Sequence, residues 1–264
     1  MLEIIKAKTD LVTDKEMKLN IAREFLQILI LQLLRSLGAF NNIAFIGGTA
    51  LRIIYKVNRY SEDLDFSVID KNKYDFTKLI KGLKAELTLL NLNTDISYKE
   101  NIVNTSMIKF ENLLPELDSR FHKQEKLNIK LEIDTNPPLG YKLETPLIDG
   151  NNIFNVVAFD LNSLMSGKLH AILNRKFAKG RDFYDLLWYL VKNIEPNLEL
   201  LNNSIEQTTG KKSNLSKSNW KPTILKRLEE FDFDAIQKDV RRFLIAQNEV
   251  ETINLVNFKQ LLTK

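Results

Sequence analysis

Apolar side chains recur along this chain with two different periods, and each period predicts a different kind of element. A helical spacing over residues 14–37 predicts a long helix that ends at Gly38, and residues 75–90 repeat the pattern more briefly. Alternation over residues 93–100, 104–111 and 127–134 predicts strands, the first two as an antiparallel pair. From residue 160 onward nearly every segment has helical spacing.

The order of these elements predicts the domain organisation. Prolines at 137, 138 and 146 mark an irregular crossing segment, and residues 154–159 form the last short strand. We therefore expect an α+β fold in two parts. Residues 1–159 would form a mixed sheet flanked by helices, and residues 160–264 a helical domain that completes the active site and the acceptor surface.

Two adjacent glycines follow the apolar run Ile43–Ile46. The chain has only 9 glycines in 264 residues, so Gly47-Gly48-Thr49 is a notable concentration. The run predicts a strand, a tight turn and a helix start, where free N–H groups and the helix dipole attract phosphate. The Thr49 hydroxyl would add a donor, and the alternative is a plain turn.

Two acids follow in an alternating segment. Asp63 and Asp65 flank Leu64, and a strand period of two places both carboxylates on one side. Two close anions repel unless a cation lies between them, and Mg²⁺ prefers oxygen ligands together with substrate phosphates. The alternative is a strand whose charges simply face water.

A third carboxylate is expected on a neighbouring strand. Residues 127–134 alternate so that Lys130, Glu132 and Asp134 share one face. Glu132 is the more central, whereas Asp134 lies at the strand end, where active-site residues of open sheets collect, which slightly favours Asp134. A merely solvated outer face is the alternative for this segment.

The segment from Leu161 to Arg181 contains no acid. Helical spacing of its apolar residues places the cations on the opposite face; these are Lys168, Arg175, Lys176, Lys179 and Arg181. Lys168 would suit the β and γ phosphates of a triphosphate. Gly180 is expected to break the helix, with Asp182 at the N-cap or first turn of the next one, over residues 183–192. Asp182 then caps that helix, orients Lys168 or Arg181, or acts on an incoming hydroxyl, and Asp185 supports an arginine.

These motifs resemble a known family. The run Ile46–Leu51, the run Arg59–Phe66 and the segment from Lys168 to Leu186 are similar to the AbiEii/AbiGii nucleotidyltransferase toxins. That family includes MenT toxins and belongs to the DNA polymerase β-like superfamily. The resemblance implies a polymerase β-like nucleotidyltransferase lobe, with Asp63, Asp65, Lys168 and Asp182 as catalytic residues. We expect the nucleotide to be bound by Gly47, Gly48, Thr49, Ser61, Lys168 and Arg181, and the metal by Asp63, Asp65, Asp134 and Glu132.

The implied activity is Mg²⁺-dependent transfer of NMP from an NTP to RNA, notably the 3′ acceptor end of tRNA. The chain would act in a type IV toxin–antitoxin or abortive-infection system and be held inactive by a cognate antitoxin. The acid-free basic segment from Lys211 to Arg227 suits a polyanion, and Trp220 within it is a candidate for base stacking. The alternatives are nucleotidylation or phosphorylation of a protein, and a non-catalytic nucleic-acid binding module.

Composition narrows the remaining classes. The chain has no cysteine and only two histidines, which excludes thiol catalysis, a disulfide framework and zinc chemistry. No run of eighteen apolar residues occurs, and the N-terminal residues do not resemble a secretory signal. We expect a cytoplasmic protein without a membrane partner.

Overall fold

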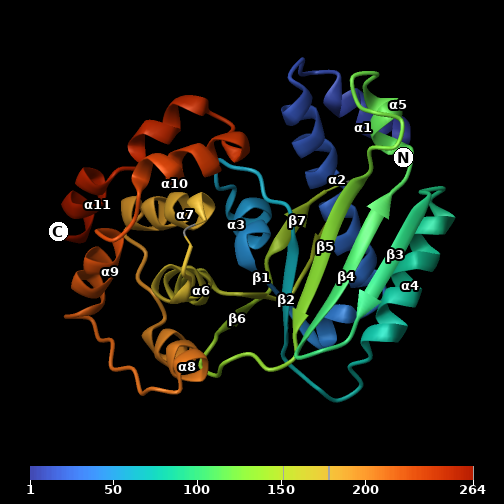
Figure 1. Ribbon diagram of the computed structural model, residues 1–264. Coiled ribbons are helices and arrows are strands. Elements are labelled where there is room, and N and C mark those ends of the chain that lie inside the picture. Colours follow the sequence, from blue (N-terminus) through green and yellow to red (C-terminus); the bar gives the residue numbers. More distant parts are fainter. Residues whose placement is uncertain (151, 178, 264) are drawn as a thin grey trace. The chain divides into compact units, whose positions relative to one another are not determined.

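The computed structural model describes residues 1–150, 152–177 and 179–263, which form two compact units (Figure 1). The first unit comprises residues 1–54, 60–137 and 145–158, and the second comprises residues 55–59, 138–144 and 159–264. Two short segments that precede residue 159 in the sequence therefore belong to the second unit.

A mixed sheet forms the centre of the first unit, with strands in the order β3-β4-β5-β2-β1-β9. β5 pairs parallel with β2 and antiparallel with β4, and β1 pairs antiparallel with β2 and parallel with β9. The strands are β1 (Ile43–Ile46), β2 (Leu64–Val68), β3 (Thr94–Lys99), β4 (Val103–Phe110), β5 (Leu127–Asp134) and β9 (Ala158–Phe159). The predicted fold class, with a mixed sheet and flanking helices, is confirmed.

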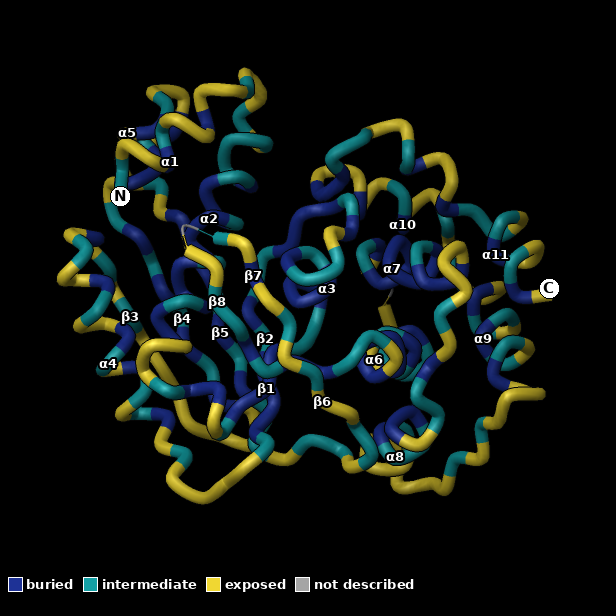
Figure 2. The backbone as a smooth tube through the Cα atoms, turned by 180° about the vertical axis from the view of Figure 1, so that it is seen from behind, coloured by how far each residue is buried: buried dark blue, intermediate teal, exposed yellow. Residues whose placement is uncertain are grey.

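Helices cover this sheet. α2 packs against β5 and against α4, and α4 packs against β3. The helices are α1 (Leu2–Thr9), α2 (Lys15–Ser36), η1 (Ala39–Asn41), α3 (Gly47–Tyr55), α4 (Phe76–Leu89) and α5 (Leu113–Leu117). A hairpin of β7 (Leu147–Asp149) and β8 (Ile153–Asn155) completes the unit. Figure 2 shows the burial of the central strands.

Local sequence explains the bounds of these elements. Asp14 and Asp75 accept bonds from the backbone N–H groups of Met17 and Lys78, and so cap α2 and α4. In β5, the four apolar positions are fully buried while the polar positions between them are not, as alternation predicts. The residue-by-residue alternation therefore fixes which side chains of β5 face away from the core.

Helices make up most of the second unit. α6 packs against α7, α8 and α9, and α7 packs against α10 and α11. The elements are β6 (Leu143–Glu144), α6 (Leu161–Asn174), α7 (Gly180–Val191), α8 (Leu198–Thr209), α9 (Trp220–Leu228), α10 (Phe233–Val240), η2 (Arg241–Phe243), η3 (Gln247–Thr252) and α11 (Leu255–Leu262). Within the described residues, no helix is long and apolar enough to cross a membrane.

Gly180 has a different role from the one expected. α6 already ends at Asn174, and Gly180 is the first residue of α7 rather than a break in the preceding helix. A Cβ atom at Gly180 would lie 2.4 Å from the carbonyl oxygen of Ile236. The missing side chain therefore lets α7 and α10 approach closely. Asp182 lies in the first turn of α7, whose N-cap is Lys179.

This close approach makes a stability prediction. Gly180→Ala is expected to lower the free energy of unfolding by about 1–3 kcal/mol, because the new methyl group must displace the α10 backbone. Gly167→Ala is the matched control, because a Cβ there meets nothing within 4 Å. That helical change is expected to raise stability by about 0.5–1 kcal/mol. Urea unfolding of both variants tests this, and equal effects would contradict the packing argument.

Candidate active site

The glycine turn holds the start of α3 against an acid of the neighbouring strand. Gly47 has a positive φ of 77°, and Ile46 before it pairs with Asp65 across β1 and β2. A Cβ atom at Gly47 would lie 2.3 Å from Oδ2 of Asp65. Only glycine allows this approach, which brings the carboxylate next to the positive end of the α3 dipole. Gly48 follows as a buried residue of α3.

Thr49 and Gln27 hold the segment that carries the acids. Thr49 is fully buried, and its hydroxyl donates to the backbone carbonyl of Asp63. The amide nitrogen of Gln27 donates to the carbonyls of Ser61, at 3.1 Å, and Glu62, at 2.9 Å. In this structure the Thr49 hydroxyl therefore positions Asp63, and the buried Ser61 contributes through its backbone.

The strand register aligns one of the two candidate third acids with Asp65. In the parallel pair of β2 and β5, Asp65 lies opposite Glu132, whereas Asp134 lies opposite Ser67. Neighbouring strands are about 4.8 Å apart, so in-register side chains of one face are adjacent. Glu132 is thus the acid of β5 beside Asp65, and Asp134 lies two residues further along.

The pKa of Lys130 is raised by three acids, Asp63, Asp65 and Glu132. Its Nζ lies 2.7 Å from Oε1 of Glu132. The hydrogen bond to Glu132 raises the pKa of Lys130, and the negative charges of Asp63 and Asp65 raise it further. The carboxylates therefore create a shared negative field on this face of the sheet.

The fit of these acids to a metal ion is partial. Carboxylate oxygens of this kind are ligands that Mg²⁺ takes, with substrate phosphates supplying others. No group of three or more acidic, histidine or cysteine side chains among the described residues is gathered closely enough to hold a metal by itself. The donor set thus fits a cation that shares its coordination with a nucleotide.

The second unit contains a cluster of five charged side chains, which we call the charge cluster: Arg59, Lys168, Arg175, Asp182 and Asp185. The buried Arg59 donates to both carboxylate oxygens of Asp185, at 2.6 and 2.5 Å. Nζ of Lys168 lies 2.8 Å from Asp185 and 3.0 Å from Asp182, and Arg175 donates to Asp182. Each carboxylate has its own arginine, so Lys168 is the surplus cation and the cluster carries a formal charge of about +1.

Both Lys168 and Asp182 are charged in this cluster. Burial by itself would lower the pKa of Lys168, but Asp185 and Asp182 outweigh it and raise that pKa. Burial would raise the pKa of Asp182, but the charges of Lys168 and Arg175 lower it below its ordinary value. A carboxylate with a lowered pKa is a weak proton acceptor, so the geometry favours Asp182 as the residue that orients Lys168.

The lowered pKa of Asp182 predicts a pH dependence of stability. Its contribution is present above the unfolded pKa of about 3.9 and is lost as pH falls through the lower folded pKa. The free energy of unfolding is therefore expected to fall more steeply in acid for the wild type than for Asp182→Asn. Urea titrations at several pH values below about 5 test this. Parallel curves would contradict it.

Arg181 and the basic segment from Lys211 to Arg227 lie outside the charge cluster as defined above. The Arg181 guanidinium lies 4.2 Å from the ring centre of Phe243. The expectation that Trp220 stacks a base is wrong, because it is 1% exposed and its Nε1 donates to Glu195. Arg227 donates to the carbonyls of Ile172 and Arg175 at the end of α6. Lys211, Lys212, Lys217 and Lys226 are exposed.

Sequence reasoning does not identify Arg59 and Arg175 as members of this cluster. In the sequence Arg59 stands out only as part of the first motif, and its partner Asp185 lies 126 residues away. One signal is present, because Asp182 and Asp185 are three residues apart and so share a helix face. Two acids on one buried face require cationic partners.

Comparison with known proteins supports a nucleotidyltransferase. Residues 30–262 match the family described as "Nucleotidyl transferase AbiEii toxin, Type IV TA system". The crystal structure of JHP933 from Helicobacter pylori shares 19% identity over 96% of this chain and 94% of that chain, with a TM-score of 0.53. A crystal structure of a candidate nucleotidyltransferase from H. pylori shares 20% identity over 92% and 93%, with a TM-score of 0.54.

At these identities the two structures establish a shared fold and no more. A search of curated proteins found no match.

Proposed function

Because the chain belongs to the AbiEii family of nucleotidyltransferase toxins of type IV toxin–antitoxin systems, we propose that it transfers NMP from an NTP to RNA. The favoured acceptor is the 3′ end of tRNA, the metal is Mg²⁺, and a cognate antitoxin restrains the activity. The surplus positive charge of Lys168, held between two carboxylates that each have an arginine, carries this proposal. Such a surplus suits an anionic triphosphate.

The acids of the first unit supply the metal site in this proposal. Asp63, Asp65 and Glu132 would hold Mg²⁺, and Asp134 is the alternative third ligand. When bound, the metal neutralises charge that develops on the reacting phosphate and on the departing pyrophosphate. Lys130 balances the acids before the metal binds, because its ammonium interacts with all three.

Each unit supplies phosphate-binding residues in this proposal. Free N–H groups at the start of α3 face the phosphates, and Thr49 holds Asp63 in place through its backbone carbonyl. Lys168 binds the β and γ phosphates, while Asp182 and Asp185 fix its ammonium. The Arg175 side chain is 44% exposed and is therefore accessible to an anion that Lys168 binds.

The choice between Glu132 and Asp134 is directly testable. Glu132→Gln is expected to lower transfer at least about 100-fold, because even supporting residues around a metal cost 10- to 100-fold. Asp134→Asn is the matched control on the same face of β5 and is expected to stay within a few-fold of wild type. Initial rates over a range of Mg²⁺ concentrations test this. The reverse ranking would assign the third ligand to Asp134.

The acceptor is tested by incubating the purified chain with labelled NTP and separate RNA and protein pools. Label is expected in RNA, and sequencing of tRNA 3′ ends is expected to show added nucleotides in growth-arrested cells. Label in protein alone would replace the RNA acceptor with a protein one. If neither pool is labelled and cells that express Asp63→Ala still stop growing, the chain would instead be a non-catalytic nucleic-acid binding module.

A further inference from the structure

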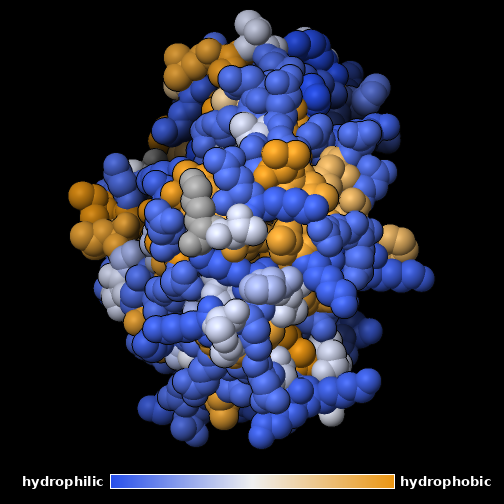
Figure 3. All heavy atoms as spheres, turned by 90° about the vertical axis from the view of Figure 1, so that its left-hand side faces the viewer, coloured by the Kyte–Doolittle hydropathy of each residue, from blue (hydrophilic) through white to orange (hydrophobic). Residues whose placement is uncertain are grey.

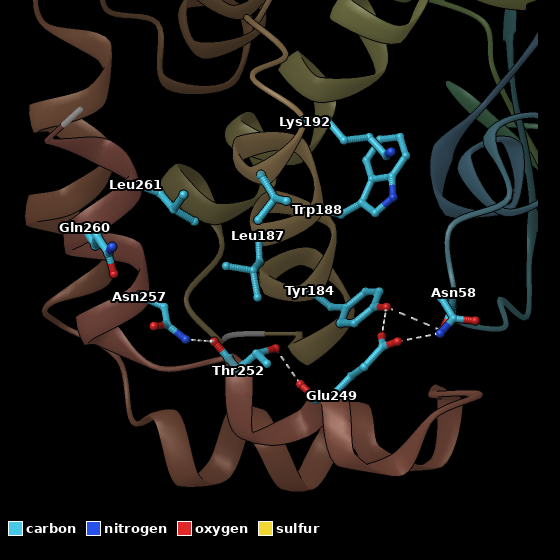
Figure 4. Close-up of a pocket in the computed structure, with 11 residues that line it drawn as sticks. Asn58, Tyr184, Leu187, Trp188, Lys192, Glu249, Thr252, Asn257, Gln260 and Leu261 are labelled. Carbon is cyan, nitrogen blue, oxygen red and sulfur yellow. Dashed lines mark hydrogen bonds between the residues drawn. The ribbon is translucent and has the colours of Figure 1, made fainter.

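A pocket of about 580 Å³ lies within the second unit, beside α7 (Figure 4). Its volume falls in the range of roughly 300–1,000 Å³ that is typical of small-molecule sites. Tyr184, Leu187 and Trp188 line it from α7, together with Lys192, Glu249 and Leu261. The charge cluster uses another face of α7, so none of these side chains is committed to it.

Glu249 is a carboxylate held by neutral groups. Its Oε1 accepts a bond from Nδ2 of Asn58 at 2.5 Å, and its Oε2 accepts one from the Tyr184 hydroxyl. No lysine, arginine or histidine in the described part of the chain forms an ion pair with it. A carboxylate accepts about four hydrogen bonds, so two acceptor positions remain on Glu249. Figure 4 shows Glu249, Tyr184 and Asn58 converging at one end of the pocket.

Lys192 and Trp188 lie together in the same pocket. The Lys192 ammonium lies 5.4 Å from the Trp188 ring centre, and Lys192 has no ion-pair partner among the described residues. Among the described residues, the lining contains no charged side chain other than Lys192 and Glu249. One negative and one positive charge favour a neutral ligand with donors at one edge and acceptors at another. Lys192 would repel a cationic ligand, and Glu249 would repel an anionic one.

The face of the molecule that carries α9 and α11 argues against a large apolar partner. The face in Figure 3, the left-hand side of Figure 1 where α9 and α11 lie, is mainly hydrophilic, with hydrophobic side chains in small separate groups. Stable protein interfaces have a more apolar, charge-depleted core. A flat aromatic ligand that fits between Trp188 and the leucines suits the pocket better.

We infer that this pocket binds a guanine base. Guanine presents a ring N–H beside an amino group, which matches the two open acceptor positions of Glu249, and its O6 and N7 accept from lysine. Trp188 offers a face for stacking. The inference rests on the proposed function, since the base would belong either to the nucleotide donor or to the RNA acceptor. Its test is independent of that function, because base binding is measured without nucleotidyl transfer.

The two tryptophans make the test direct. Trp220 is 1% exposed, so a change in fluorescence on ligand addition reports on Trp188. GMP is expected to quench this fluorescence at lower concentration than AMP, CMP or UMP. IMP, which differs from GMP only by the missing amino group, is expected to bind at least about tenfold more weakly, because a hydrogen bond to a charged group is lost.

Variants assign the effect to the pocket. Glu249→Gln is expected to weaken GMP binding at least about tenfold and to remove the preference for GMP over IMP. Lys192→Met changes an exposed side chain and is expected to weaken GMP binding without affecting the melting temperature. If Glu249→Gln fails to fold, Lys192→Met and the GMP–IMP comparison still decide the matter.

The arms of the experiment separate the possible outcomes. Tighter binding of GTP than of a guanosine-containing RNA oligomer assigns the pocket to the donor, and the reverse assigns it to the acceptor. Equal binding of GMP and IMP, or of all four monophosphates, overturns the inference. Binding of an arginine amide in place of any base also overturns it and points to a partner's cationic side chain. Guanine binding without transfer would refute the proposed function alone, and transfer without guanine binding would refute the inference alone.

Discussion

Asp65→Asn is expected to reduce nucleotidyl transfer by about 10³-fold while the fold survives. A metal supplies several kcal/mol of charge stabilisation in the transition state, and about 4 kcal/mol corresponds to this factor. Asp65 is the acid placed beside both the glycine turn and Glu132, so no other described acid of this face occupies its position. Transfer rates at saturating NTP and Mg²⁺ measure the effect.

Stability provides the control for this variant. Repulsion between Asp63 and Asp65 in the metal-free protein opposes the stabilisation of the Asp65 charge by the α3 dipole and by Lys130, so the neutral asparagine is expected to change the melting temperature only slightly. Asp70→Asn, an exposed acid just beyond β2, is the matched control and is expected to retain full activity. Activity within a few-fold of wild type for Asp65→Asn would contradict a metal role.

Arg59→Met is expected to lower the free energy of unfolding by about 3–5 kcal/mol, because it leaves Asp185 buried without its bidentate partner. The side chains of Arg59 and Asp185 are 1% and 0% exposed, so water cannot replace the lost bonds. The remaining contact of Lys168 with Asp185, at 2.8 Å, compensates only in part. Urea unfolding monitored by circular dichroism measures the loss.

The double variant Arg59→Met with Asp185→Leu separates the two contributions. Replacing a buried ion pair by apolar groups is often neutral for stability, so the double variant is expected to recover most of the loss. Transfer is expected to remain impaired, because Lys168 keeps only Asp182 as its partner. If Arg59→Met lowers the free energy of unfolding by less than about 1 kcal/mol, the pair contributes no more than an exposed ion pair does, which would contradict this prediction.

Local patterns in the sequence predict much of the fold. β5 begins and ends where alternation indicates, α2 and α4 differ from their predicted bounds by about one residue, and the antiparallel pair β3–β4 is confirmed. These features depend on neighbouring residues, which periodicity records. The family resemblance is confirmed as well, because residues 30–262 match the family.

The errors arise where distant contacts decide. The patterns do not predict α1. They indicate a helix break at Gly180, whereas the structure explains this glycine by its close packing against α10, which the sequence pattern does not record. The basic segment around Trp220 suggests an aromatic ring that stacks a base, although Trp220, Ile224 and Leu228 recur every four residues and are all buried in α9. The surrounding lysines obscure this helical pattern. The pairing of Arg59 with Asp185 leaves no periodic signal.

The position of Arg59 in the sequence limits how this protein can be divided. It lies in residues 55–59, which the chain contributes to the second unit before it returns to build β2. A truncated chain that starts at residue 160 would contain both buried aspartates but lack the guanidinium that neutralises one of them. Expressing the helical half by itself is therefore expected to yield an unstable fragment. Its stability is expected to return when residues 55–59 are joined to the fragment, and not when the start of the fragment is shifted by a few residues.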